Sequence, residues 1–266
     1  MSEAQFTHTR PALGIGEILS KTFKFTFSNI GIVTLLAIVP VALNYLTSGL
    51  LLGWNYALVG QFDGTEGPGF FFNFAISLIV GVLSWSIVAA VLTLYTYDVS
   101  LKNPPRISLY IQRALSVILP LIVLAVVGYL LVIVGFFLFI IPGLWLMAVL
   151  SVVVPAVVVE SVGFGGLMRS ANLTKEYRWP IVGALILMLI LTFLISIAGT
   201  FVVSFLSEVV AGGLQSFLGL IVLFVGLSVM QAVMTAILSI CVVIIYMRLR
   251  EIKEGTTVED IATVFE

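Results

Sequence analysis

Polar side chains recur inside three long apolar stretches, and they are the residues best able to bind a ligand there. One set occurs at every fourth position, which on a helix follows a single, slowly winding face: Thr192, Ser196, Thr200, Ser204 and Glu208. A second set is Gln231, Thr235 and Ser239, and a third is Asn44 and Ser48. Hydroxyl, amide and carboxyl groups at these spacings could hydrogen-bond a polar molecule within a membrane.

Two interpretations of these polar sets remain open. In the first, the helices that carry these residues line a polar cavity or ligand path. In the second, they serve only close packing, because small residues let helix backbones approach and hydroxyl groups bond to carbonyl groups. The amides of Asn44 and Gln231 exceed what packing alone requires.

Few residues in the chain could perform acid–base, nucleophilic or metal chemistry. The single histidine, His8, lies in a polar N-terminal segment, and the single cysteine, Cys241, lies within an apolar stretch. No pair of carboxyl groups occurs in the middle of an apolar stretch. Because acid–base and metal catalysis need several such groups on one scaffold, we expect no enzymatic activity, no cofactor and no metal site.

A different kind of candidate site lies where one apolar stretch ends. Glu160 closes that stretch, and Arg169 follows it across the Gly-rich bend at 163–166. Opposite charges on the two sides of a flexible bend predict an ion pair that clamps two helices together. Asp98, at the end of an earlier stretch, is likewise expected to pair with a neighbouring basic residue, Arg113, Arg169 or Lys175. The alternative role for both carboxylates is a cytoplasmic gate.

The composition requires lipid as the solvent for most of the chain. Of the 266 residues, 61% are hydrophobic and 9% are charged, whereas soluble domains have about 45–50% apolar and about 25% charged residues. Six apolar runs are long enough to cross a bilayer, at about 30–53, 70–99, 115–138, 142–160, 180–207 and 214–247. The sequence therefore predicts an all-α integral membrane protein with one domain over residues 1–266, including a polar tail at 1–12 and a C-terminal tail at 250–266. The few scattered basic residues exclude a nucleic-acid interface.

The basic residues predict the orientation of these helices. All 12 fall in the N-terminal region, in alternate loops or after the last run: Arg10, Lys21, Lys24, Lys102, Arg106, Arg113, Arg169, Lys175, Arg178, Arg248, Arg250 and Lys253. The opposite loops carry only acidic charges, at Asp63, Glu66 and Glu208. Because cytoplasmic loops are enriched in Lys and Arg, we expect both termini in the cytoplasm.

The segments before the first, third and fifth runs have amphipathic patterns. In the first, Glu17, Lys21 and Lys24 recur at helical spacing between apolar residues such as Leu19 and Phe23. We expect each segment to form a cytoplasmic interfacial helix, an elbow, followed by a two-helix hairpin. The alternative is a cytoplasmic extension of the following helix, and for the third segment the pattern favours neither. The turn of the middle hairpin is predicted at Ile141-Pro142-Gly143.

Short motifs across nearly the whole chain resemble a known family. They are GIGEILSKTFKFTFSNIG at 14–31, IPGLW at 141–145, GLMRSANLTKEYRWPIVG at 166–183 and YMRLREIKEG at 246–255, together with Pro155 and Glu160. They resemble the YciC-like bacterial inner-membrane proteins and the membrane domain fused to some glycerophosphoryl diester phosphodiesterases. The resemblance implies a six-helix fold in the bacterial cytoplasmic membrane and an acidic–basic pair at Glu160 and Arg169. The phosphodiesterase catalytic domain is absent from this sequence.

These features predict a non-enzymatic membrane protein that binds or helps to move a lipid or other amphipathic molecule. The proposed ligand path lies between the first, fifth and sixth apolar runs. The alternative is a structural or regulatory subunit of a larger membrane assembly, without a ligand of its own. Expected partners are membrane lipids and, for the alternative, another membrane protein.

Overall fold

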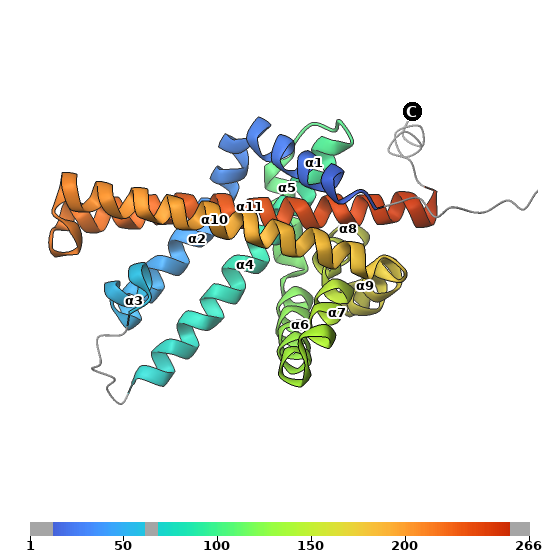
Figure 1. Ribbon diagram of the computed structural model, residues 1–266, viewed down its shortest axis with the longest axis horizontal. Helices are drawn as coiled ribbons and strands as arrows, with labels where there is room; N and C mark the ends of the chain where they lie inside the picture. Colours follow the sequence, from blue (N-terminus) through green and yellow to red (C-terminus); the bar gives the residue numbers. More distant parts are fainter. Residues whose placement is uncertain (1–12, 62–68, 256–266) are drawn as a thin grey trace, which may run out of the picture.

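The computed structural model describes residues 13–61 and 69–255, which form helices and short connections with no strand among them (Figure 1). The polar tail at 1–12, the loop acids Asp63 and Glu66, and residues 256–266 lie outside the described residues. Six helices are long and apolar enough to cross a membrane. They are α2 (Ile30–Leu52), α4 (Phe70–Ser100), α6 (Ile118–Leu138), α7–α8 (Ile140–Leu150 and Val153–Glu160), α10 (Arg178–Ala211) and α11 (Phe217–Glu254). The chain is thus a multi-pass α-helical membrane protein.

Shorter helices connect these six. Three precede a long helix in the chain: α1 (Ile15–Ser28), α5 (Ile107–Ser116) and α9 (Gly166–Thr174). Two short 3-10 helices, η1 (Gly163–Gly165) and η2 (Gly213–Gln215), occupy bends. The helix α3 (Trp54–Val59) was not expected from the sequence, because it lies in the polar-flanked loop after the first apolar run.

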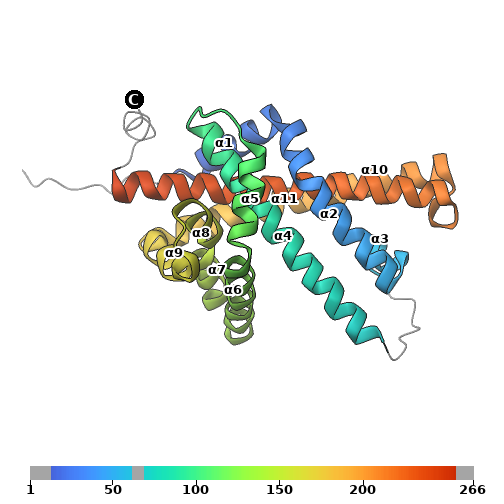
Figure 2. The same ribbon diagram turned by 180° about the vertical axis from the view of Figure 1, so that it is seen from behind.

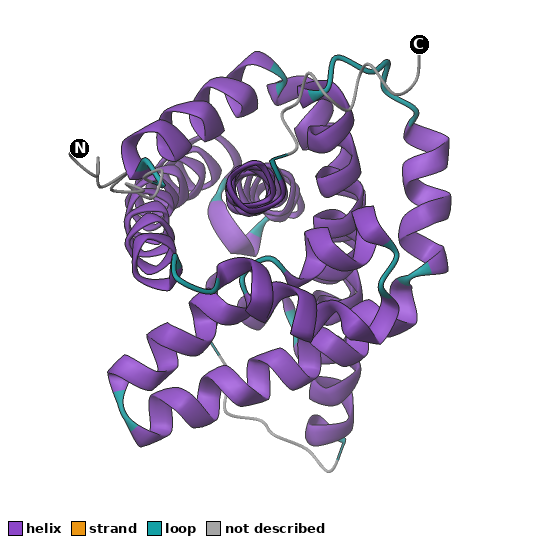
Figure 3. Cartoon of the chain, turned by 90° about the vertical axis from the view of Figure 1, so that its right-hand side faces the viewer, coloured by secondary structure: helices purple, strands orange, loops and turns teal. Residues whose placement is uncertain are grey.

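Helix α11 forms the centre of the molecule. It contacts α1, α2, α3, α4, α8, α9 and α10, and it is seen end-on in the middle of Figure 3. Its buried positions include small residues such as Ala232 and Ala236, which let neighbouring helices approach closely. The polar residues of α11 therefore lie at the junction of several helices.

Consecutive long helices pack side by side as α2 with α4, α6 with α7, and α10 with α11. The three pairs diverge from one another: α10 and α11 follow the long axis, α2 and α4 run obliquely, and α6 and α7 run across it (Figure 1). The view from behind shows the same divergence (Figure 2). Divergent pairs cannot fill the space between them completely, and cavities occur beside α4 and α11.

Prolines define where four of the helices begin. Each is the third residue of its helix: Pro120 in α6, Pro142 in α7, Pro155 in α8 and Pro180 in α10. The first four N–H groups of a helix lack an intrahelical acceptor, so proline loses nothing there and fixes φ near the helical value. The expected turn at Ile141-Pro142-Gly143 is wrong for this reason: the chain turns at Phe139, and Pro142 and Gly143 belong to α7.

The fourth apolar run is broken where the sequence predicted one continuous span. Helix α7 ends at Leu150 and α8 begins at Val153. The Ser151 hydroxyl donates to the Ala148 carbonyl at 2.8 Å at this break, and Pro155 has no N–H with which to continue the α7 hydrogen bonds.

Close approach of α6 and α7 depends on Gly143, in the first turn of α7. A Cβ atom at Gly143 would lie 2.5 Å from the Phe136 ring, whereas a Cβ at Gly31 would meet nothing within 4 Å. We expect Gly143→Leu to lower thermal stability, by about 1–3 kcal/mol if it follows other overpacked sites. The matched variant Gly31→Leu should melt like the wild type in the same detergent. Equal melting temperatures for all three proteins would contradict this packing.

Candidate functional site

A cavity of about 420 Å³ lies between α2, α4 and α11, with α3 on one side. Its volume is within the range of about 300–1,000 Å³ that is usual for small-molecule sites. It is partly open to the outside of the molecule. The cavity lies beside the middle of α4 and α11 and beside the second half of α2.

The two amides singled out from the sequence face this one cavity. Asn44 comes from α2 and Gln231 from α11, and both line it. Neither amide has a hydrogen-bond partner among the described residues. Gly81 of α4 leaves room for one of them, since a Cβ there would lie 3.1 Å from the Asn44 Nδ2 atom. Gln231 is exposed.

Other hydrogen-bonding side chains surround these amides. Ser48, Ser84 and Thr235 line the cavity with hydroxyl groups, and Tyr45 and Tyr56 also contribute to its wall. The Ser48 hydroxyl lies 2.6 Å from that of Ser77, which ties α2 to α4. No charged residue is among the described residues that line the cavity. Its chemistry therefore suits an uncharged group that both donates and accepts hydrogen bonds.

The stripe on the fifth span does not contribute to this cavity. Thr192 is buried and donates to the Met188 carbonyl at 2.9 Å, and Ser196 is half-buried. Thr200, Ser204 and Glu208 are exposed. At 3.6 residues per turn, each step of four residues rotates about 40° around the axis, so the stripe turns by roughly 160° over its length. It begins facing the interior and ends facing outward, and α4 takes the place in the cavity wall that the sequence suggested for α10.

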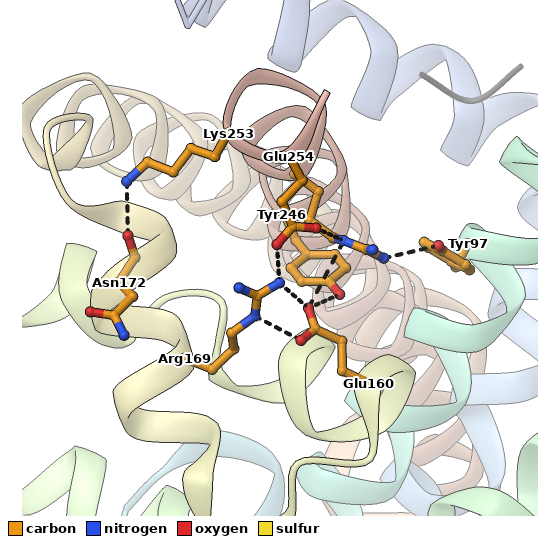
Figure 4. A network of polar contacts seen from close by, with 8 residues as sticks. Tyr97, Glu160, Arg169, Asn172, Tyr246, Lys253 and Glu254 are labelled. Carbon is orange, nitrogen blue, oxygen red and sulfur yellow. Dashed lines mark hydrogen bonds and ion pairs between the residues drawn. The ribbon is translucent and has the colours of Figure 1, made fainter. Parts of the chain in front are cut away.

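The second candidate site is a polar network at the opposite end of α11 from its turn with α10 (Figure 4). Arg169 of α9 donates twice to Glu160 of α8, through Nε to Oε2 at 2.7 Å and through Nη2 to Oε1 at 3.0 Å. The Tyr246 hydroxyl donates to the same Oε1 atom at 2.6 Å. These hydrogen bonds to Glu160 are the main cause of the raised pKa of Arg169, whose guanidinium therefore stays charged.

The network extends beyond the predicted pair onto α11 and α4. Glu254 accepts from Arg169 and also from Arg250, the latter at 2.8 Å. Arg250 in turn donates to the Tyr97 hydroxyl of α4 at 3.3 Å (Figure 4). The α11 members recur at every fourth residue, as Tyr246, Arg250 and Glu254, and this spacing was the available signal that they share one face. Their contacts with Glu160 and Arg169 were not predicted from the sequence.

Asp98 has a different partner from the ones expected. It accepts a hydrogen bond of 2.7 Å from the Tyr110 hydroxyl of α5, which ties α5 to the end of α4. Burial, and after it this hydrogen bond, raises the pKa of Tyr110 to about 12. Arg113, one of the basic residues expected to pair with Asp98, contacts Ser161 instead.

Fold and sites together define an α-helical membrane protein with an uncharged polar cavity among its spans and a charged network at one end. Within residues 13–61 and 69–255, no group of three or more His, Cys, Asp or Glu residues is placed to hold a metal ion. Comparisons with protein families, with curated proteins and with solved structures find no match.

Proposed function

We propose that this protein binds, or helps to move, an amphipathic membrane molecule whose polar end is uncharged. The observation that carries the proposal is that two amides without protein partners, Asn44 and Gln231, face one cavity among the membrane spans. An unsatisfied polar group away from water costs about 1–3 kcal/mol, so an amide kept there needs a compensating role. A bound hydroxyl, ester or other carbonyl group supplies that compensation.

The proposal includes an arrangement in the membrane. The pairs α2–α4, α6–α7 and α10–α11 are taken as three hairpins, with α1, α5 and α9 as elbows at the cytoplasmic surface. Support comes from the two faces of α1, on which Ile18 and Leu19 are buried while Lys21 and Lys24 are exposed. The distribution of basic residues supports cytoplasmic termini, and the resemblance to YciC-like proteins supports a bacterial cytoplasmic membrane.

Orientation is tested with single cysteines in a Cys241→Ala background, since Cys241 is buried. Asn103→Cys should be protected from a membrane-impermeant thiol reagent in intact cells, because it follows α4 in a loop that carries Lys102 and Arg106. Gln61→Cys and Gly212→Cys should react, because their loops are on the other side. Labelling of Asn103→Cys in intact cells, with Gln61→Cys protected, would reverse the orientation.

A structural or regulatory subunit remains the second candidate, and one observation favours it. Gln231 is exposed at the surface of the α11 span, where a polar group of another membrane protein could pair with it. Asn44 is only half-exposed and faces the cavity, so a protein partner would satisfy one amide and leave the other. A ligand inside the cavity can satisfy both.

The ligand proposal is tested by thermal stabilisation of the purified protein. An uncharged monoacylglycerol added to the detergent should raise the melting temperature saturably, because it binds the folded state only. Asn44→Leu and Gln231→Leu should each reduce that rise, whereas Ser204→Val, which removes an exposed hydroxyl outside the cavity, should keep it. A rise that is equal in all four proteins, or absent from the wild type, would contradict the proposal.

A further inference from the structure

A second cavity, of about 400 Å³, lies on the other side of α4. Its walls come from α4, α6, α7, α8, α10 and α11, and most of its lining is apolar, as at Leu124 and Leu150. Two of its hydroxyl groups are already satisfied within the chain: Thr93 donates to the Ala89 carbonyl at 2.6 Å, and Ser151 to the Ala148 carbonyl. This cavity therefore offers hydrocarbon contact and few free hydrogen bonds.

The two cavities are neighbours along α4 and α11. Trp85 of α4 lines both of them. On α11, Thr235 lines the polar cavity, and Ser239, one turn further along, lines the apolar cavity. A molecule that extends along this face of α11 therefore passes from hydrogen-bonding surroundings into apolar ones beside Trp85.

We infer that the two cavities form one bipartite site for an uncharged, single-chain lipid, with its polar end at Asn44 and Gln231 and its hydrocarbon chain in the apolar cavity. This inference rests on the proposed function, because it assumes that the polar cavity holds the polar end. No described residue that lines the polar cavity is charged, so a phosphate-bearing headgroup would lie there without an opposite charge. An uncharged headgroup therefore fits this cavity better. The lipid class is thus a glycerol ester, a long-chain alcohol or a molecule of similar polarity.

The volume of the apolar cavity suits a ligand with one chain. An apolar protein cavity of about 150 Å³ holds one benzene molecule, so about 400 Å³ holds on the order of a dozen or more carbon atoms. That amount suits one acyl chain and not two. Trp85 and Tyr129 lie in edge-to-face contact, with ring centroids 6.0 Å apart, and Tyr129 also lines this cavity. The two rings connect α4 to α6 beside the place where the chain passes.

Glycine and alanine on α6 keep the apolar cavity open. A Cβ at Gly128 would have only an ordinary contact, 3.7 Å from Leu150 Cδ1, so a larger side chain there extends toward the cavity. Ala125, also in the lining, offers a second position for filling it. Leucine at either position should shorten the space for the chain and leave the polar cavity intact.

The test uses two photoreactive monoacylglycerols with one chain of about twelve carbons, sized to the cavity. One carries a diazirine at the chain end and the other carries it next to the ester. After irradiation of the purified protein, the chain-end probe should label residues 124–132 and 147–155, and the ester-end probe residues 41–48 and 231–235. Gly128→Leu and Ala125→Leu should each reduce chain-end labelling about tenfold or more, the usual scale for a misfitted apolar group. Because both ends belong to one molecule, each variant should also raise the probe concentration needed for ester-end labelling, which should stay at residues 41–48 and 231–235.

Two outcomes separate the inference from the proposed function. Chain-end labelling spread over the exposed face of α10, with ester-end labelling still at 41–48, would overturn the inference and leave the proposed function standing. Labelling by both probes that is the same in an Asn44→Leu/Gln231→Leu protein would overturn both. If one filling variant fails to fold, its melting curve shows this, and the other variant decides the result.

Discussion

Arg169→Leu is expected to lower the melting temperature by about 5–10 °C, more than any other single change to a charged group within residues 13–61 and 69–255. The substitution removes one of the two cations that Glu160 and Glu254 share and leaves Arg250, whose Nε lies 4.0 Å from Glu160 and 2.8 Å from Glu254. Removing one partner of a fully buried pair costs about 3–5 kcal/mol, and here the Arg169 and Glu160 side chains are 28% and 17% exposed, so about 2–3 kcal/mol is expected. The measurement is a thermal melt in detergent at fixed pH and lipid content.

A double-mutant cycle identifies the source of that loss. Glu160→Gln and Arg169→Gln should each destabilise the protein, and their combination should cost less than the sum of the two. An exchange of the two charges should restore little, because an arginine at position 160 would face Arg250, whose Nε lies 4.0 Å from Glu160 in the wild type. Additive losses in the cycle would mean that the pair contributes no coupling energy.

The double variant Asn44→Leu/Gln231→Leu is expected to melt at a higher temperature than the ligand-free wild type while losing ligand binding. Both amides lack partners among the described residues, although Asn44 is half-buried and Gln231 is exposed. Within a membrane span, where lipid rather than water surrounds them, each unsatisfied amide costs up to about 1–3 kcal/mol. Leucine removes that cost and has a similar volume. Residues held for binding rather than for stability commonly show this opposition between stability and function.

The matched control for that variant is Ser48→Ala. Ser48 also lines the cavity, but its hydroxyl is 2.6 Å from Ser77 and holds α2 to α4, so its loss should lower the melting temperature. The melting temperature is therefore expected to rise in the double variant and to fall in Ser48→Ala. A double variant that is destabilised like Ser48→Ala would mean that Asn44 and Gln231 are structural groups.

Features encoded locally were predicted well from the sequence. The six apolar spans depend on composition and length, and the structure confirms all of them to within a few residues at most ends. Composition defines the helix ends less well. Pro142 is the third residue of α7, so this helix begins two residues before the proline. For this reason the turn, which lies at Phe139, was predicted too late in the chain. The break between α7 and α8 was missed, since both halves are equally apolar.

The membership of the sites depends on which helices are neighbours, and that information is not local. Asn44 and Gln231 were selected as polar exceptions in apolar spans, but nothing in their spacing shows that α4 rather than α10 completes the wall of their cavity. The stripe on α10 was predicted to follow one face, although each step of four residues moves the side chain by about 40° around the helix axis. Trp85, which lines both cavities, was not singled out, because a tryptophan in an apolar span is indistinguishable from a packing residue.

The most direct test of the central claim is native mass spectrometry of the protein purified in mild detergent, with identification of the lipid that remains bound. One uncharged lipid with hydroxyl or ester groups is expected, bound one to one in the wild type and in Ser204→Val, and absent from Asn44→Leu/Gln231→Leu. A mixture of bulk phospholipids, equally retained by all three proteins, would contradict the claim that the cavity between α2, α4 and α11 is a binding site.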